Sequence, residues 1–298
     1  MVVRSSRRDS GRWRAPVKPK PPPSLELATA ESAAVEDEAT FSRLGFFDLD
    51  LSGRSADGAE FAQCRFRGTD LSGARLEGAR FADCLFESTN LANLRAEKSS
   101  MLRVRLSTAR MTGVQWINGA VRDVTISDCR LDLSSWRFTD FSSVAFEGCN
   151  LTRADFQNAD LRGARFTDCD LTGAQFSQAT VTGTRFANCV LAGIGGVTSM
   201  AGAIVAQQDL AALSYTLAGA LGSASRTPTG SEPGRGRGPA SHARRASAGR
   251  VGRAGVGPQA LIGAGRRPGP RGPSAGHTQF PTWTGARPVG GGVIETRA

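Results

Sequence analysis

The sequence predicts an all-β solenoid over residues 41–197, and three observations support this prediction. Every fifth residue from Phe46 to Leu191 is apolar, and 28 of these 30 residues carry a large side chain. The residue two positions before each of them is small from Ala59 to Cys189, with Leu94 as the one exception. All six cysteines share this small position. Neither a helix of period 3.6 nor a strand of period 2 gives a period of five, so we expect a coil in which each repeat supplies one side and one turn.

The large and small positions together predict the core. An interior with one bulky and one small group per repeat is narrow, and the polar residues between them are expected to face water. The large core residues that we expect are Phe61, Phe66, Leu71, Leu76, Phe81, Phe86, Phe141, Phe146, Leu151, Phe156, Leu161, Phe166, Leu171 and Phe176.

Glycine recurs two residues after the large position, where the chain must turn a corner. Gly53, Gly73, Gly113, Gly163 and Gly173 are examples. Glycine adopts positive φ without steric cost, so these positions are predicted corners.

The segment Ala159-Asp160-Leu161-Arg162-Gly163 resembles the pentapeptide repeat family, whose motif is written A-(D/N)-L-x-x. The resemblance covers about half of the chain at one fixed phase. It implies a right-handed, four-sided parallel β-helix with four repeats per coil. On that basis the 30 repeats make seven and a half coils.

The cysteines agree with a coil of 20 residues, because neighbouring members of each group are 20 residues apart. The groups are Cys64 and Cys84, then Cys129, Cys149, Cys169 and Cys189. We expect two columns of buried thiols that act as small hydrophobic groups. A disulfide between adjacent coils and a metal site are the alternative interpretations.

The repeat is irregular at two places. Arg54 occupies a small position and Ala56 a large one, which predicts a bulge or a short loop at residues 52–58. At Leu94 and Ala96 the large and small roles are exchanged, which conserves volume and need not break the coil.

Residues 198–222 are predicted to form a C-terminal capping or dimerisation helix. Leu210, Leu213, Leu217 and Leu221 have helical spacing, and Tyr215 is expected to pack at the cap or at a dimer contact. An open solenoid end exposes apolar side chains and strand edges, so a cap is required. The resemblance adds a homodimer formed through this helix.

The two ends of the chain differ in composition from the repeats. Residues 1–40 are rich in proline and charge and predict a disordered leader. Residues 223–298 hold 12 Arg against two Glu, and we expect a disordered basic tail. Two interpretations of the tail stay open: an arm that binds nucleic acid, and a product of a shifted reading frame in a GC-rich gene.

The sequence contains few parts for catalysis. His242 and His277 are its histidines, and both fall in the predicted disordered tail. No G-x-x-x-x-G-K-[ST], H-E-x-x-H or G-x-S-x-G motif occurs. We therefore expect no enzyme, no catalytic residue, no cofactor and no metal. The sequence shows neither a signal peptide nor a membrane span, which predicts a cytoplasmic protein.

Three functions remain: a rigid scaffold that binds a protein partner, a modulator of DNA gyrase, and a nucleic-acid binder that uses the tail. The gyrase hypothesis, with a type II topoisomerase as partner, comes from the resemblance, because the family includes quinolone-resistance proteins that mimic DNA with an acidic surface. Residues 41–222 carry 18 basic and 19 acidic residues, so such mimicry would need one acidic face.

Overall fold

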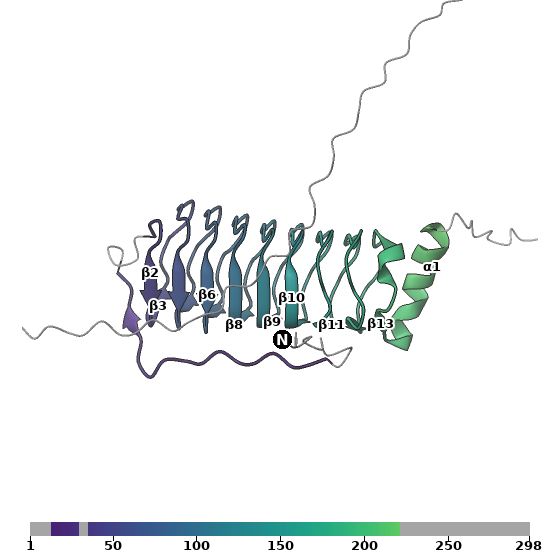
Figure 1. Ribbon diagram of the computed structural model, residues 1–298, viewed down its shortest axis with the longest axis horizontal. Helices are drawn as coiled ribbons and strands as arrows, with labels where there is room; N and C mark the ends of the chain where they lie inside the picture. The colour runs from purple at the N-terminus through teal and green to yellow at the C-terminus, as the bar shows by residue number, and fades with distance from the viewer. Residues whose placement is uncertain (1–12, 30–34, 221–298) are drawn as a thin grey trace, which may run out of the picture. The chain divides into compact units, whose positions relative to one another are not determined.

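The computed structural model describes residues 13–29 and 35–220, which form a parallel β-solenoid of about nine turns with a short C-terminal helix (Figure 1). The fold class predicted from the sequence is confirmed. The tail from residue 223 and Leu221 lie outside the described residues. The strands are β1 (Glu26–Leu27), β2 (Thr40–Ser42), β3 (Leu44–Phe47), β4 (Glu60–Ala62), β5 (Arg65–Arg67), β6 (Arg80–Ala82), β7 (Leu85–Glu87), β8 (Ser100–Ser107), β9 (Ala120–Ser127), β10 (Asp140–Glu147), β11 (Ala164–Thr167), β12 (Arg185–Ala187) and β13 (Ile204–Val205). Two short 3-10 helices, η1 (Val197–Met200) and η2 (Gln207–Asp209), precede α1 (Leu210–Ala220).

The coils stack in register at 20 residues per turn. One face is the ladder β1-β3-β5-β7-β8-β9-β10-β11-β12-β13, and a neighbouring face pairs β2, β4, β6 and β8. Parallel bridges such as Asp50↔Asp70 and Ser55↔Arg75 hold the other two faces. We name the faces after their inward residues in one coil: the Val121, Ile126, Leu131 and Trp136 faces. The repeats from Phe46 to Leu191 supply most turns, and β1 and β13 add a strand at each end.

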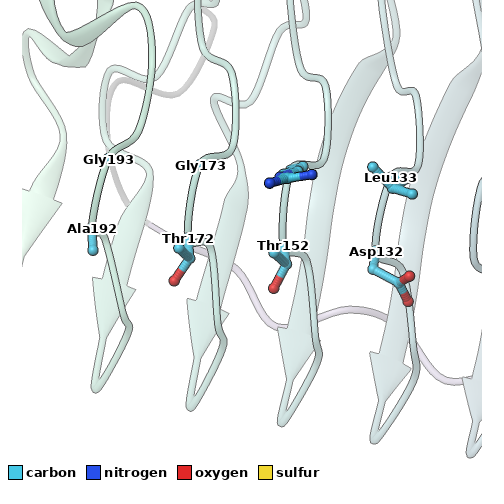
Figure 2. Close-up of a pocket in the computed structure, with 8 residues that line it drawn as sticks. Asp132, Leu133, Thr152, Thr172, Gly173, Ala192 and Gly193 are labelled. Carbon is cyan, nitrogen blue, oxygen red and sulfur yellow. The ribbon is translucent and has the colours of Figure 1, made fainter.

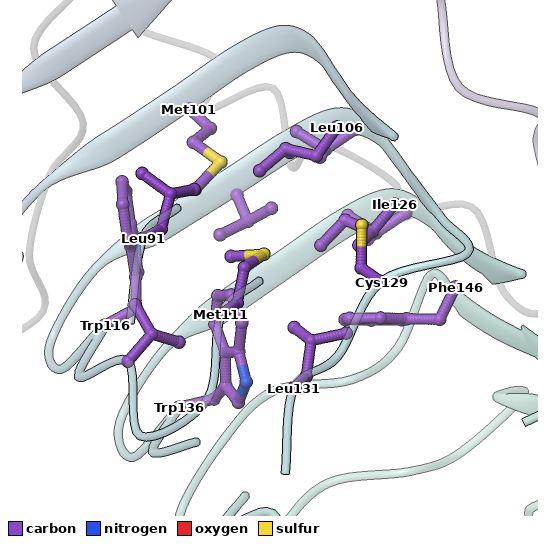
Figure 3. Close-up of a cluster of buried hydrophobic side chains, with 14 of the residues drawn as sticks. Leu91, Met101, Leu106, Met111, Trp116, Ile126, Cys129, Leu131, Trp136 and Phe146 are labelled. Atoms are coloured by element: carbon purple, nitrogen blue, oxygen red, sulfur yellow. The ribbon is translucent and has the colours of Figure 1, made fainter. Parts of the chain in front are cut away.

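The interior consists of stacked side chains of the same type. All 30 residues that recur at every fifth position from Phe46 to Leu191 are buried. Phe46, Phe66 and Phe86 stack face to face with ring centroids 4.6 and 4.5 Å apart. Figure 3 shows the middle coils, where Trp116 and Trp136 stack on another face with a centroid separation of 6.4 Å. Each coil thus buries its apolar groups on its neighbours, which is the main stabilising force of a solenoid.

The two irregular repeats keep the register. No bulge forms at residues 52–58, contrary to the prediction, because the amides of Gly53, Ala56 and Gly58 all donate to the next coil. Arg54 is exposed, so its side chain leaves the interior and the backbone does not have to shift. Leu94 and Ala96 are both buried and the ladder runs through them.

The six cysteines are free and buried, in two columns of the small position. The thiols of Cys64, Cys84, Cys149 and Cys169 each donate to the carbonyl oxygen of the inward residue 23 positions earlier, over 3.3–3.5 Å. The hydroxyls of Thr69, Ser99, Thr139 and Thr184 make the same bond over 2.6–2.8 Å. The small position therefore accepts any short side chain, and the polar ones satisfy a carbonyl of the preceding coil.

The corners are left-handed, as the glycines predicted, but many other residues adopt the same conformation. Gly53, Gly73 and Gly113 have φ between 63° and 68°. Leu133 (φ 59°) and Phe138 (φ 56°) are among the non-glycine residues at this position. L-residues pay a steric cost there, of about 1–2 kcal/mol for most side chains.

At the C-terminal end, η2 and α1 close the last coil through polar bonds as well as apolar contact. Asp209 is buried and its carboxylate accepts from the amide of Cys189 over 2.9 Å. Thr216 accepts from the amide of Gly193 over 3.3 Å. Of the predicted apolar face, Leu213 is buried, whereas Leu210 and Leu217 are exposed.

Tyr215 is 76% exposed, so it does not pack at the cap, and its expected place at a dimer contact stays a prediction. The helix begins at Leu210 because the chain first adds β13 to the sheet, which the sequence did not indicate. No helix in the described part of the chain is long and apolar enough to cross a membrane.

The sequence predicted disorder for residues 1–40, but the described part of this leader makes defined contacts with the solenoid. Strand β1 adds to the sheet beside β3, and Val35 joins the core. Glu26 and Ala28 donate their amides to the carbonyls of Arg43 and Gly45. The leader thus supplies the N-terminal cap of the solenoid, because these bonds satisfy the edge of its first coil.

Candidate interaction surface

A shallow groove of about 580 Å³ follows the Leu131 face across four coils (Figure 2). The groove is lined by Asp132, Leu133, Thr152, Arg153, Thr172, Gly173, Ala192 and Gly193. Each coil contributes two of these residues: one directly follows the inward residue, and the next lies at the corner. Stacked over four coils, they form two adjacent columns. The corner column passes from leucine and arginine to two glycines, and the missing side chains leave the surface hollow there.

Local hydrogen bonds fix the polar side chains of this groove. The hydroxyls of Thr152 and Thr172 donate to Asn150 and Asp170 over 2.7 and 2.6 Å. The amides of both threonines donate to the same oxygens. Side chains that are already held lose little rotamer freedom on binding, so the groove is preorganised for contact.

Leu133 and Phe138 stand out on the coils, because they are large, apolar and exposed. They are 58% and 47% exposed, and they sit at successive corners of one coil. Arg137 lies over the Phe138 ring with its Cζ atom 5.7 Å from the centroid. Leu133 and Phe138 thus each combine a strained left-handed backbone with an exposed apolar side chain. Glycine or asparagine at a purely structural corner would avoid both costs.

None of the four faces is strongly acidic. We assign each outward residue of 40–195 to its face, with the corner residue counted in the face before it. The Val121 face carries five acidic and five basic residues: Glu60, Asp83, Asp123, Asp140 and Asp160 against Arg43, Arg80, Arg103, Arg122 and Arg162. The Ile126 face is also balanced, with Asp48, Glu87, Asp128, Glu147 and Asp168 against Arg65, Arg67, Arg105, Arg165 and Arg185.

The other two faces are close to neutral as well. The Leu131 face holds Asp50, Asp70, Asp132 and Asp170 against Arg110, Arg130 and Arg153. The Trp136 face holds Asp57, Glu77, Glu97 and Asp155 against Arg54, Arg75, Arg95, Lys98 and Arg137. A surface on which acidic and basic residues alternate suits a polar protein partner with charges of both signs. It is less suited to a partner that carries charges of one sign only.

The residues expected from the sequence divide clearly between core and surface. All the phenylalanine, leucine and cysteine core residues named above are buried. Among residues 13–29 and 35–220 there is no group of three side chains that could hold a metal ion. Sequence reasoning missed Leu133 and Phe138; the signal was a large apolar residue two positions after an inward one, where glycine or a polar residue is usual.

Two family models match this repeat pattern: pentapeptide repeats in eight copies over residues 46–83, and a pentapeptide repeat region over residues 137–195. Together with the 20-residue register, these matches decide the family. The chain is a pentapeptide-repeat protein. The comparison with curated proteins found no match to this pentapeptide-repeat protein.

Several solved pentapeptide-repeat structures are similar in fold. QnrB1, a plasmid-mediated fluoroquinolone resistance protein, is 21% identical over 68% of this chain and 100% of its own, with a TM-score of 0.30. HetL, involved in heterocyst differentiation regulation in the cyanobacterium Nostoc sp. strain PCC 7120, is 14% identical over 56% of this chain and 85% of its own, also with a TM-score of 0.30.

Proposed function

We propose that this pentapeptide-repeat protein is a non-enzymatic scaffold that binds a protein partner across the corner formed by Leu133 and Phe138 and the adjoining groove. The observation that supports this proposal is the pair of exposed apolar side chains at strained corners of one coil. Apolar anchors beside a preorganised polar rim are the usual composition of a protein interface. The rigid stack of coils holds these anchors at a fixed separation.

The charge distribution argues against DNA mimicry as the mechanism. A DNA mimic needs a continuous acidic surface, and each face of residues 40–195 is balanced to within one charge. Gyrase therefore enters as a partner to be tested and not as the proposed one. Nucleic-acid binding by residues 223–298 concerns a part of the chain outside the described residues.

The test compares partners captured by the full chain and by the double variant Leu133→Asn/Phe138→Asn. Asparagine tolerates positive φ, so the variant should gain about 1 kcal/mol of unfolding free energy while it loses the anchors. We expect quantitative mass spectrometry to show specific partners that the variant loses.

Val190→Asn is the matched control, because Val190 is 49% exposed but its backbone is not left-handed. This control should keep the partners and gain no stability. Capture of the same partners by all three proteins would refute the proposed surface.

A further inference from the structure

Residues 13–29 contact the solenoid with a period of three. Every third residue is partly buried, and the two between are exposed. The partly buried residues are Trp13, Pro16, Pro19, Pro22, Leu25 and Ala28. A backbone with three residues per turn and no internal hydrogen bonds is a polyproline II helix, which proline favours. This segment therefore presents one proline-rich edge to the coils, and in Figure 1 it runs below them in purple.

Two backbone amides of the segment donate to acidic corner residues. Val17 donates to the Asp123 carboxylate over 3.1 Å, and Lys20 donates to the Asp83 carboxylate over 3.0 Å. The Lys20 carbonyl oxygen accepts from the Gln63 side-chain amide over 3.3 Å. Both donors directly follow a proline on the inner edge, so proline shapes the helix while the next residue supplies the hydrogen bond.

The spacing of these bonds matches the spacing of the coils. Asp83 and Asp123 occupy the same corner column two coils apart, at the junction of the Val121 and Ile126 faces. Two coils rise by about 9.6 Å at the strand spacing of about 4.8 Å. One turn of polyproline II, from Val17 to Lys20, rises by about 9.3 Å. Successive turns of the peptide can therefore meet successive acceptors without being stretched.

One of the two acceptors, Asp83, is held by a neighbouring residue of the solenoid itself. Arg103 donates to both oxygens of Asp83, over 2.7 and 2.6 Å, and Asp83 is only 9% exposed although it lies at an outward position. Burial acts to raise the pKa of Asp83, but the bonds from Arg103 and the Lys20 amide outweigh it and lower that pKa. The carboxylate is thus charged at neutral pH, and charge strengthens its bond with the amide.

The segment is also anchored at both ends. The Trp13 ring lies 5.1 Å from the Arg165 guanidinium carbon, a cation–π contact. At the other end, β1 pairs with β3. One extended peptide therefore crosses the coils from the neighbourhood of Arg165 to the first turn.

We propose that the corner column of Gln63, Asp83, Arg103 and Asp123 is a binding site for polyproline II peptides. Its ligand has prolines three residues apart, two of which are each followed by a residue with a free N–H, and residues 13–29 of this same chain occupy it. This site lies at another corner of the coils than Leu133 and Phe138, so it does not depend on the proposed external partner.

The first test is hydrogen exchange of residues 14–20 in the full chain, followed by mass spectrometry. Asp83→Gly/Asp123→Gly removes both acceptors, and glycine suits their φ values of 56° and 54°. Exchange at Val17 and Lys20 should rise about tenfold or more in this variant. Ser143→Gly, in the same column with φ 54° and with no hydrogen bond described for its side chain, should leave exchange unchanged. Equal exchange in wild type and the Asp83/Asp123 variant would overturn the proposal.

A second pair of variants changes the peptide instead of the coils. Lys20→Pro keeps the polyproline II backbone but removes a donor, whereas Lys18→Pro alters an exposed neighbour whose amide is in no described bond. We expect Lys20→Pro alone to increase exchange at Val17. Equal effects of the two substitutions would show that the amide bonds do not hold the segment.

The third test supplies the ligand in trans. A fluorescent peptide of residues 13–29 should bind the full chain carrying Pro16→Gly/Pro19→Gly/Pro22→Gly, and bind wild type at least about tenfold more weakly, because the resident segment competes. Adding Asp83→Gly/Asp123→Gly to the triple variant should abolish binding. No difference between wild type and the triple variant would refute the site. Protection in wild type that grows with protein concentration would place a second copy on the column and contradict occupancy by the same chain.

Discussion

The small inward position controls how closely the coils pack, and Gly119 is its most restrictive member. A Cβ atom at Gly119 would lie 2.4 Å from Trp116 Nε1 and 2.7 Å from the Ser99 carbonyl oxygen. Glycine at this position makes room for the indole ring of Trp116. The substitution of one residue therefore tests the packing of the middle coils.

We expect Gly119→Ala to lower the unfolding free energy by about 1–3 kcal/mol, because backbone oxygen cannot move aside as a flexible side chain could. Chemical denaturation measures the change. Gly219→Ala is the control: its Cβ would meet nothing within 4 Å, and alanine favours the α1 helix, so this variant should be equally or more stable. A neutral effect at Gly119 would mean that the Trp116 region is loosely packed.

The thiol columns predict a loss of stability at high pH. The hydrogen bond with Cys129, together with burial, raises the pKa of Cys149 to about 12, and the bond with Cys149, together with burial, raises that of Cys169 to about 12. Burial raises the pKa of Cys84 as well, while Cys64 and Cys129 shift in the opposite direction and offset part of the effect.

A raised folded pKa stabilises the protein below the unfolded value of about 8.5 and loses that contribution as the pH rises toward 12. The unfolding free energy should therefore fall between pH 8.5 and higher values in denaturant titrations. Cys149→Ser/Cys169→Ser should show a smaller fall, since serine can donate the same bond as Ser99 and does not ionise. An identical fall in both proteins would assign the alkaline loss to other groups.

Among the structural elements, the C-terminal cap depends on a polar contact. Asp209 accepts from the Cys189 amide 20 positions earlier, as Ser99 Oγ and Cys129 Sγ accept from the amides of Ala79 and Ala109. Asp209→Ala leaves a buried donor without its acceptor and should cost about 1–3 kcal/mol. Asp209→Asn keeps an acceptor oxygen and should lose less. Thermal unfolding of the two variants ranks them, and equal losses would show that charge, and not the bond, matters.

The elements also show which features the sequence could predict. The five-residue period predicts the inward residues, the register and the corners, because every coil places the same repeat positions in its interior and at its corners. The caps were not predictable in detail, since they are unique segments: β1 and β13 join the sheet through backbone bonds, which leave no side-chain pattern. By composition, residues 13–29 resembled a flexible leader. Their period of three could be interpreted as a binding pattern only once the structure showed hydrogen-bond acceptors two coils apart.

The candidate surface was harder to predict than the fold. Leu133 and Phe138 are conspicuous only once the corner column is known to be left-handed and exposed. The groove beside them comes from the order of side chains down one column, from Leu133 to Gly193. The order of side chains down one column involves residues that are 20 positions apart in the sequence. The five-residue repeat motif does not reveal this order.

At the scale of the whole solenoid, charge balance separates this protein from an acidic DNA mimic. The net charge of +10 belongs to the chain ends, because the coils carry nearly equal numbers of acidic and basic residues. Residues of opposite charge also pair between coils, as Arg65 does with Glu87 over 2.7 Å and Arg80 with Glu60 over 2.6 Å. Such pairing shortens the range of the surface potential.

We therefore expect the full chain, at micromolar concentration and about 0.15 M salt, to leave gyrase supercoiling and its inhibition by a fluoroquinolone unchanged. A gel shift with the same DNA, run in parallel, detects direct binding of DNA by the basic ends, which would slow supercoiling without any contact with gyrase. Protection from the drug at concentrations that do not shift DNA would contradict the prediction. That result would mean that a charge-balanced stack of coils can engage gyrase through shape and local contacts, and the Leu133→Asn/Phe138→Asn variant would then show whether the apolar corner makes those contacts.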